Sequence, residues 1–215
     1  MPDQITPEIE ALLRDAAEWR LLGLLFECPS DAWQSQLAAL AAEVHDPDLR
    51  AAAAEAKPEA EEGMYHSIFG PGGPAPPRQA TYHESMELGY LMSSLHTSYH
   101  AFGYAPATPE PVDHVAVEIG FVAWLKFKEA FARSFGDLEK AELARDAAAR
   151  FTADYLSTMA EPLANILSHS GIEYLVLAGK VLRQRSGPKK QPLKVHDSHF
   201  PIFGDAEASF ECGTL

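Results

Sequence analysis

One stretch of the sequence, residues 104–135, constrains the fold more than any other. Three prolines, Pro106, Pro109 and Pro111, exclude a helix before about Pro111, because proline lacks an N–H and restricts the residue before it. No further proline follows up to Phe135, and apolar residues occupy more than one face of the predicted helix. A helix of this kind is normally buried on several sides. We therefore expect a central helix that the rest of the chain surrounds.

The start of this helix carries its polar residues. Pro111 suits the first turn, where its missing N–H is not needed, and Asp113 falls in the same turn, near the positive end of the helix dipole. His114 and Glu118 are four residues apart and point the same way. Helix capping would account for Asp113, but not for His114, because a positive charge is disfavoured at this end.

The rest of the chain also follows a helical period, and strand alternation is nowhere convincing. The fold class predicted is therefore all-α, a compact bundle-like helical domain over residues 1–186. A Pro- and Gly-rich stretch, residues 70–77, is predicted to be a hinge between lobes of about 1–70 and 78–186. This stretch lacks the Lys-Ser/Thr of a phosphate-binding loop, and no strand precedes it.

Local signals place several helix ends. Thr6 with Pro7 and Asp46 with Pro47 predict helix starts, because a capping side chain precedes a proline at the first helical position. Ser30 is predicted to cap a second helix. Lys57-Pro58 is predicted to interrupt the third helix, before it resumes to Phe69.

Later elements are predicted in the same way. One helix is expected over about residues 83–102, and Gly136-Asp137 is expected to end the central helix. A long helix follows, in which Pro162 is predicted to cause a kink or break. Ser170 and Glu173 form a capping-box pattern that predicts the last helix, to about Arg185. The largest core side chains predicted are those of the central helix: Ile119, Phe121, Trp124 and Leu125.

Composition excludes several classes of protein. The chain of 215 residues has a formal charge of −14, so nucleic acid is an unlikely partner, since phosphate contacts require clustered lysine and arginine. Cys28 and Cys212 are the two cysteines and form no CxxC pair, which argues against a disulfide framework or zinc knuckle. The first residues do not read as a signal peptide, and no apolar run is long enough to span a membrane. We expect a cytoplasmic monomer or weak homodimer.

The segment from residue 187 to 215 differs from the domain before it. It begins with a basic, Pro- and Gly-containing stretch and then becomes apolar. Two interpretations stay open: a loose end that lies over the domain, or an apolar peptide that docks in a groove of this chain or of a neighbour. The apolar residues that suggest docking are Phe200, Ile202, Phe203 and Phe210.

Catalysis finds little support in the sequence. No GxSxG elbow is present, and neither cysteine lies in a setting that favours a thiolate. The chain carries no nucleotide-binding motif, and we predict no cofactor and no metal. The alternative is a helical metal-binding protein or enzyme that uses His96, His100, His114 and Glu118, although no HExxH motif or Glu-x-x-His pair occurs.

The central stretch also carries a resemblance to a known family. Glu110-Pro111-Val112-Asp113-His114, followed by Glu118 and Phe121, resembles the E-P-x-D-H stretch of the TorD/DmsD/NarJ family. The upstream residues follow the successive landmarks of that family from Tyr65 to Gly103, and the match is good over roughly Tyr65 to Leu125. Those landmarks are Tyr65, Phe69-Gly70-Pro71-Gly72, Pro76-Pro77, Tyr82, Glu84-Ser85, Tyr99 and Phe102-Gly103.

The resemblance implies a non-enzymatic cytoplasmic chaperone. Its expected partner is the apo catalytic subunit of a dimethyl sulfoxide reductase-type molybdoenzyme, bound through its twin-arginine signal peptide, its mature body or both. Such a chaperone assists cofactor insertion and delays export. The partner-binding residues predicted are Tyr82, Glu84, Ser85, Tyr99, Glu110, Pro111, Asp113, His114 and Glu118.

Overall fold

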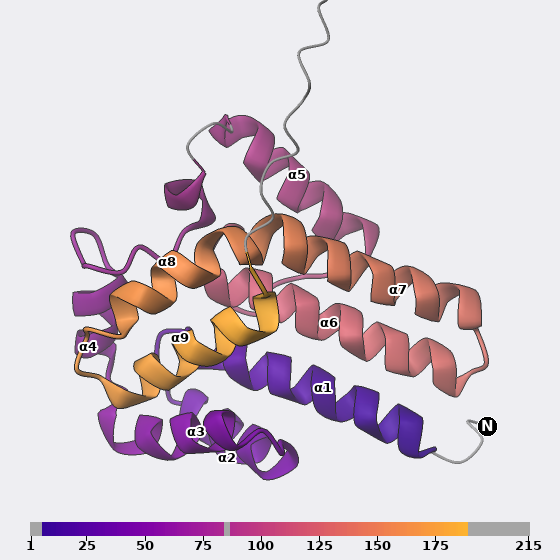
Figure 1. Ribbon diagram of the computed structural model, residues 1–215, viewed down its shortest axis with the longest axis horizontal. Helices are drawn as coiled ribbons and strands as arrows, with labels where there is room; N and C mark the ends of the chain where they lie inside the picture. The colour runs from indigo at the N-terminus through magenta and orange to yellow at the C-terminus, as the bar shows by residue number, and fades with distance from the viewer. Residues whose placement is uncertain (1–5, 84–86, 189–215) are drawn as a thin grey trace, which may run out of the picture.

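A computed structural model describes residues 6–83 and 87–188, and every structural statement below concerns these residues (Figure 1). They form α-helices joined by short connections and contain no β-strand, so the all-α prediction is confirmed. The connection between α4 and α5 contains a 3₁₀ turn, Gln79–Tyr82, and α7 continues into α8 through a π-helical turn, Thr152–Leu156. The helices are α1 (Pro7–Leu24), α2 (Trp33–Glu43), α3 (Pro47–Glu59), α4 (Glu62–Phe69), α5 (Leu88–Ala101), α6 (Val115–Ser134), α7 (Leu138–Phe151), α8 (Ser157–Leu167) and α9 (Glu173–Ser186).

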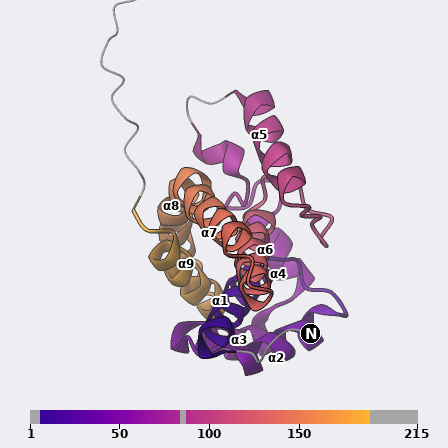
Figure 2. The same ribbon diagram turned by 90° about the vertical axis from the view of Figure 1, so that its right-hand side faces the viewer.

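Helix α6 is the central helix, as its sequence predicts. It packs along α1 on one side and along α7 on another (Figures 1 and 2). Its side chains Ile119, Phe121 and Leu125 are buried, which confirms their place in the core. Trp124 is partly buried and packs against the core, so it is less buried than the other three predicted core side chains of α6. Its indole N–H donates to the Phe102 carbonyl oxygen at 3.0 Å, at the edge of the core.

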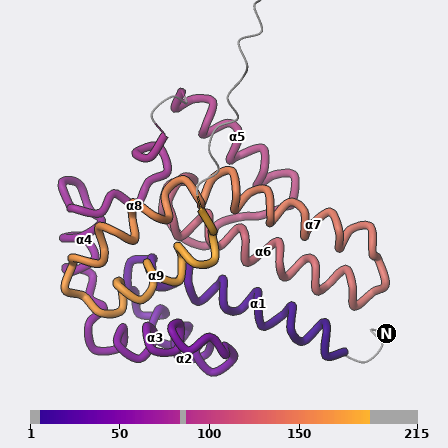
Figure 3. The backbone as a smooth tube through the Cα atoms, viewed as in Figure 1, coloured from indigo at the N-terminus to yellow at the C-terminus, as the bar shows by residue number. Residues whose placement is uncertain are grey.

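Helices α1 and α6 approach each other closely. A Cβ atom added to Gly23 would lie 3.4 Å from the Ala116 carbonyl oxygen, in van der Waals contact, so the two backbones lie close together at this point. The pair runs antiparallel, and the start of α1 lies at the same end as the turn between α6 and α7 (Figure 3). There Arg133 pairs with Glu8 at 3.0 Å.

The helix starts that depend on a cap followed by proline are confirmed. The Thr6 hydroxyl accepts from the Ile9 N–H at 3.3 Å, and an Asp46 carboxylate oxygen accepts from the Asp48 N–H at 3.0 Å. The Gly136-Asp137 break is also confirmed, and Asp137 caps α7. The sequence alone is sufficient to predict these helix starts, because each capping side chain bonds within its own helical turn.

Other predicted helix ends differ from the structure. Helix α2 starts at Trp33 with no side-chain cap, so Ser30 does not cap it. The interruption predicted at Lys57-Pro58 is present but slightly later: α3 ends at Glu59, with Pro58 in its last turn, and α4 runs from Glu62 to Phe69. Proline is tolerated there because the carbonyl group that loses its N–H partner belongs to Ala54, which is exposed to solvent.

The C-terminal helices also differ from the prediction. Helix α8 continues through Pro162 without a break. The departure from α-helical geometry lies before Pro162, in the π-helical turn Thr152–Leu156, and such turns are a recognised cause of bends in helices. Helix α9 has no side-chain cap, so the capping box is wrong; the Ser170 hydroxyl instead accepts from the Ile172 N–H at 3.2 Å. The helix expected over about residues 83–102 begins at Leu88, after the 3₁₀ turn.

One hydrophobic cluster contains residues from both sides of the 70–77 connection, including Leu22 from α1 and Val122 from α6. The domain and lobe boundaries stay a prediction. The docking residues Phe200 to Phe210 lie outside the described residues. Among the helices that are described, none combines the length and hydropathy that a membrane span requires.

Phe121 provides a test of the core. Its ring lies 4.8 Å from the rings of Tyr99 and Phe151, so Phe121→Ala should lower the unfolding free energy by about 3–5 kcal/mol, as large-to-small core changes do. Trp124→Ala should cost less, because part of that ring already faces solvent. Urea denaturation of both variants measures the difference. A larger loss for Trp124→Ala would contradict the placement of these two side chains.

Candidate functional site

Asp113 is fully buried, and its partner is an arginine distant in sequence. Arg78 donates through Nε to the Asp113 Oδ1 atom at 2.8 Å, and its Nη2 lies 2.6 Å from the same oxygen. The main chain joins the two segments as well, because the Gln79 N–H donates to the Asp113 carbonyl oxygen at 2.8 Å. The prediction that Asp113 caps the first turn of the central helix is therefore wrong. The helix begins at Val115, and Asp113 anchors the 70–82 segment to its start.

His114 is the N-cap of α6. Its Nδ1 atom accepts from the Ala116 N–H at 3.2 Å, so the neutral ring carries its proton on Nε2. Nε2 lies 3.2 Å from the Tyr65 hydroxyl, which donates to a Glu110 carboxylate oxygen at 2.9 Å. A hydrogen-bonded chain therefore runs from the start of α6 through α4 to Glu110.

Burial keeps His114 in its neutral form. It lowers the pKa of the imidazole from 6.5 to about 4, and the nearby Arg78 guanidinium acts in the same direction, while Glu110 and Asp113 oppose the shift. The main cause of the low pKa is therefore loss of water around the ring. His114 therefore adds no positive charge to the site at neutral pH.

Glu118 is completely buried one turn into α6. Within the described residues neither of its carboxylate oxygens has a hydrogen-bond partner. Burial, and secondarily the charge of Asp113, raise its pKa well above the ordinary value. The protonated, neutral carboxyl group is thus favoured at this position.

The remaining predicted site residues occupy different depths. The Tyr99 side chain is buried, and its hydroxyl donates to the Val112 carbonyl oxygen at 2.8 Å. Tyr82 is half-buried in the 3₁₀ turn and donates to the Pro76 carbonyl oxygen at 2.7 Å. Glu84 and Ser85 lie outside the described residues. The structure thus gathers Tyr82, Glu110, Pro111, Asp113 and His114 around the 70–82 segment, while Tyr99 and Glu118 lie in the core behind them.

A cavity of about 490 Å³ opens beside this cluster, and we refer to it as the Glu110 cavity. Its walls come from the face of α4, the Pro- and Gly-rich segment and the residues before α6. Glu110 is the acidic residue in this wall, and its side chain is 21% exposed. The lining residues that carry the argument are Tyr65, Phe69, Pro77, Glu110, Pro111 and His114.

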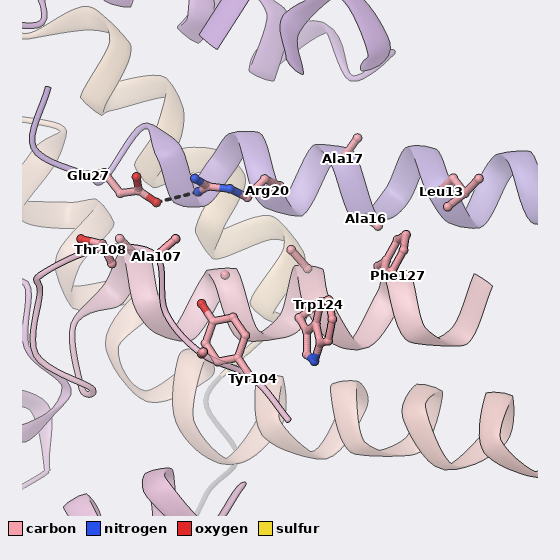
Figure 4. Close-up of a pocket in the computed structure, with 14 residues that line it drawn as sticks. Leu13, Ala16, Ala17, Arg20, Glu27, Tyr104, Ala107, Thr108, Trp124 and Phe127 are labelled. Atoms are coloured by element: carbon pink, nitrogen blue, oxygen red, sulfur yellow. Dashed lines mark hydrogen bonds and ion pairs between the residues drawn. The ribbon is translucent and has the colours of Figure 1, made fainter. Parts of the chain in front are cut away.

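A second cavity, of about 460 Å³, lies between α1 and α6 and is called here the α1–α6 pocket (Figure 4). Its walls are mainly apolar, with Leu13 from α1 facing Trp124 and Phe127 from α6. The Arg20–Glu27 ion pair, at 2.6 Å, closes one end. The chain from Tyr104 to Thr108 borders this pocket, and the next residues, Glu110 and Pro111, border the Glu110 cavity.

A row of exposed aromatic side chains continues from the α1–α6 pocket along α6. The rings of Trp124 and Phe127 are 5.8 Å apart, those of Phe127 and Phe131 6.2 Å, and those of Phe131 and Phe135 4.8 Å. Phe127, Phe131 and Phe135 are 42%, 55% and 60% exposed. A contiguous apolar surface of this kind is typical of a binding surface.

The sequence analysis missed two features of the site. Arg78 carries no local signal, and only the search for a cation to neutralise a buried Asp113 could have found it. The aromatic row had a signal, because Phe127, Phe131 and Phe135 repeat every four residues and therefore share one helix face.

The proposed histidine ligands do not come together. His96 and His100 are exposed on α5, whereas His114 and Glu118 are buried at the start of α6. In the described part of the chain, the group of three potential metal ligands that does form contains none of these four residues. The geometry therefore does not support the metal site of the alternative interpretation.

The low pKa of His114 predicts a dependence of stability on pH. The unfolded chain binds a proton near pH 6.5 and the folded chain only near pH 4, so the stability contributed by neutral His114 is lost as pH falls between these values. From about pH 7 to pH 4, the wild type should lose about 3 kcal/mol more unfolding free energy than His114→Asn, which retains a capping side chain. Urea denaturation across this range measures it. Equal losses in the two proteins would contradict a buried, neutral His114.

Glu118 predicts the opposite slope. Because its pKa is raised in the folded state, ionisation favours the unfolded chain as pH rises above the ordinary value of 4.5. The unfolding free energy of Glu118→Gln should therefore improve relative to the wild type from about pH 5 to pH 8. A difference between the two proteins that stays constant over this range would show that Glu118 has a stabilising partner.

Comparison with known families supports the resemblance drawn from the motifs. A search of curated proteins found no match. The family described as nitrate reductase delta subunit matches residues 30–165, which is more than half of the chain and includes α2 to α7, the Glu110 cavity and the whole of the predicted motif region. The chain belongs to the nitrate reductase delta subunit family, the NarJ/TorD-type chaperones of molybdoenzyme maturation.

Proposed function

We propose that this chain is a cytoplasmic chaperone that binds the apo catalytic subunit of a dimethyl sulfoxide reductase-type molybdoenzyme. The bound segment of this client carries an arginine next to an apolar stretch, as a twin-arginine signal peptide does. The arginine occupies the Glu110 cavity and the apolar stretch occupies the α1–α6 pocket. The chaperone holds the client until its cofactor is inserted, and so delays export.

The partly exposed Glu110 carboxyl group in the cavity wall, with no lysine or arginine partner among the described residues, is the observation that carries this proposal. In the described residues its polar partners are the Tyr65 hydroxyl and the neutral His114 ring, and neither of them neutralises a carboxylate. Asp113, by contrast, already has the Arg78 guanidinium. A partly exposed carboxylate in a cavity wall is a good acceptor for arginine, because charge-assisted hydrogen bonds are stronger than neutral ones.

The neighbouring pocket supports the second half of the proposal. The connection from Tyr104 to Pro111 separates the two cavities, so a bound peptide that crosses it can place a basic residue in one and apolar residues in the other. Trp124 and Phe127 offer the apolar contact. The net charge of −14 further favours a basic client segment over an acidic one.

Variants of the two cavities test the proposal. The client is first identified by co-purification from the native cell, and its N-terminal segment is then titrated against the chaperone by fluorescence anisotropy. Glu110→Gln should weaken binding about 10- to 100-fold, the usual range for loss of a hydrogen bond to a charged group, while keeping the acceptor for Tyr65. Phe127→Ser should weaken binding as well.

Matched controls lie on α7. Glu142 is an exposed glutamate and Leu143 is 55% exposed, so Glu142→Gln and Leu143→Ser make the same chemical changes away from both cavities. Neither control should change client affinity. If Glu110→Gln binds like the wild type while Phe127→Ser does not, the arginine contact is wrong and the apolar pocket alone remains. If both bind normally, the client site lies elsewhere.

A further inference from the structure

A group of three potential metal ligands lies at the edge of the Glu110 cavity, whose wall includes one of them, His66. The Cys28 thiol, a Glu62 carboxylate oxygen and a His66 ring nitrogen all lie within 4.8 Å of one another. They come from two segments, the chain that follows α1 and the exposed edge of α4. Such a combination of sulfur, nitrogen and oxygen ligands is not explained by helix packing.

Core contacts hold the two segments in place. The Phe26 ring packs against Phe69 at 6.2 Å, and the Tyr65 ring packs against Phe69 at 5.2 Å. Cys28 therefore leaves the core two residues after Phe26, beside α4. Glu62 and His66 are one helical turn apart on α4, with 3.6 Å between the His66 Nε2 atom and the nearest Glu62 carboxylate oxygen. The three side chains thus meet on a rigid support and need only small rotamer changes to share one ion.

The electrostatic setting favours a cation. Glu62 and Glu110 bring two carboxyl groups close to the Cys28 thiol. Among the described residues, the ion pairs of these two glutamates are with histidines, and neither includes a lysine or arginine. A divalent ion would neutralise this concentration of negative charge.

We propose that Cys28, Glu62 and His66 form a zinc site. Zinc accepts thiolate, imidazole and carboxylate ligands in tetrahedral geometry, whereas magnesium and calcium require oxygen ligands. Three protein ligands leave the fourth position for water or an external ligand. Binding releases the thiol proton of Cys28 to solvent, so affinity increases with pH. The inference is independent of the client and goes beyond chaperone function.

Cobalt substitution tests the site on the full-length protein without a histidine tag. Co²⁺ should produce a near-ultraviolet thiolate-to-cobalt absorption band that added Zn²⁺ removes. Cys28→Ser should abolish the band, and His66→Asn and Glu62→Gln should each weaken Co²⁺ binding about tenfold or more. Cys212→Ser removes the other cysteine of the chain and should leave the band unchanged.

Two further measurements separate loss of the zinc site from misfolding of a variant and from failure of the client proposal. In the unmodified protein, Zn²⁺ should slow alkylation of Cys28 by iodoacetamide, as read by peptide mass spectrometry, without slowing that of Cys212; this result does not depend on whether a variant folds. Glu110→Gln should retain the cobalt band, so failure of the client proposal and failure of this one are separate results. The proposal is wrong if the wild type shows no thiolate band, if Cys28→Ser retains it, or if zinc leaves Cys28 alkylation unchanged.

Discussion

The ion pair between the buried Asp113 carboxylate and the partly exposed Arg78 guanidinium is the interaction on which the site depends. A carboxylate without water or a partner would cost several kcal/mol, so the 70–82 segment must lie where Arg78 can reach Asp113. This requirement places the Pro- and Gly-rich connection across the start of α6. It also places Tyr65 and Glu110 at one cavity, because His114 follows Asp113 directly and bonds to Tyr65. Asp113 and His114 of the family motif therefore hold neighbouring segments of the chain in place.

The same arrangement makes Glu110 the one acidic residue in the described cavity wall, which also contains Arg78, the partner of Asp113. Asp113 is neutralised by Arg78, His114 is kept neutral by burial, and burial favours the protonated form of Glu118. The Glu110 carboxyl group lies partly exposed in the wall of a cavity, next to an apolar pocket that Trp124 and Phe127 complete. A chaperone has to recognise an unfolded segment without a folded epitope. A carboxylate next to an apolar surface provides a means of recognition that depends only on short-range chemistry.

The sequence predicts what local chemistry decides. Thr6-Pro7 and Asp46-Pro47 mark helix starts correctly because each cap bonds within its own turn, and the periodicity of residues 115–134 identifies the buried central helix. Prediction from the sequence fails where a contact with a residue distant in the sequence determines the role of a side chain. Asp113 reads as a cap because the sequence does not show that Arg78 lies beside it. Periodicity places Trp124 on the core side of α6, but it does not show how much of the ring its neighbours leave exposed.

We propose that the client binds along the connection between the Glu110 cavity and the α1–α6 pocket. Hydrogen–deuterium exchange of the chaperone, free and in complex with its co-purified client, tests this claim most directly. Protection on binding should concentrate in residues 65–78 and 104–116 and in α6 around Trp124 and Phe127, with little change in α2 and α3. Protection confined to α2, α3 or α7, with none in the 104–116 segment, would contradict the claim.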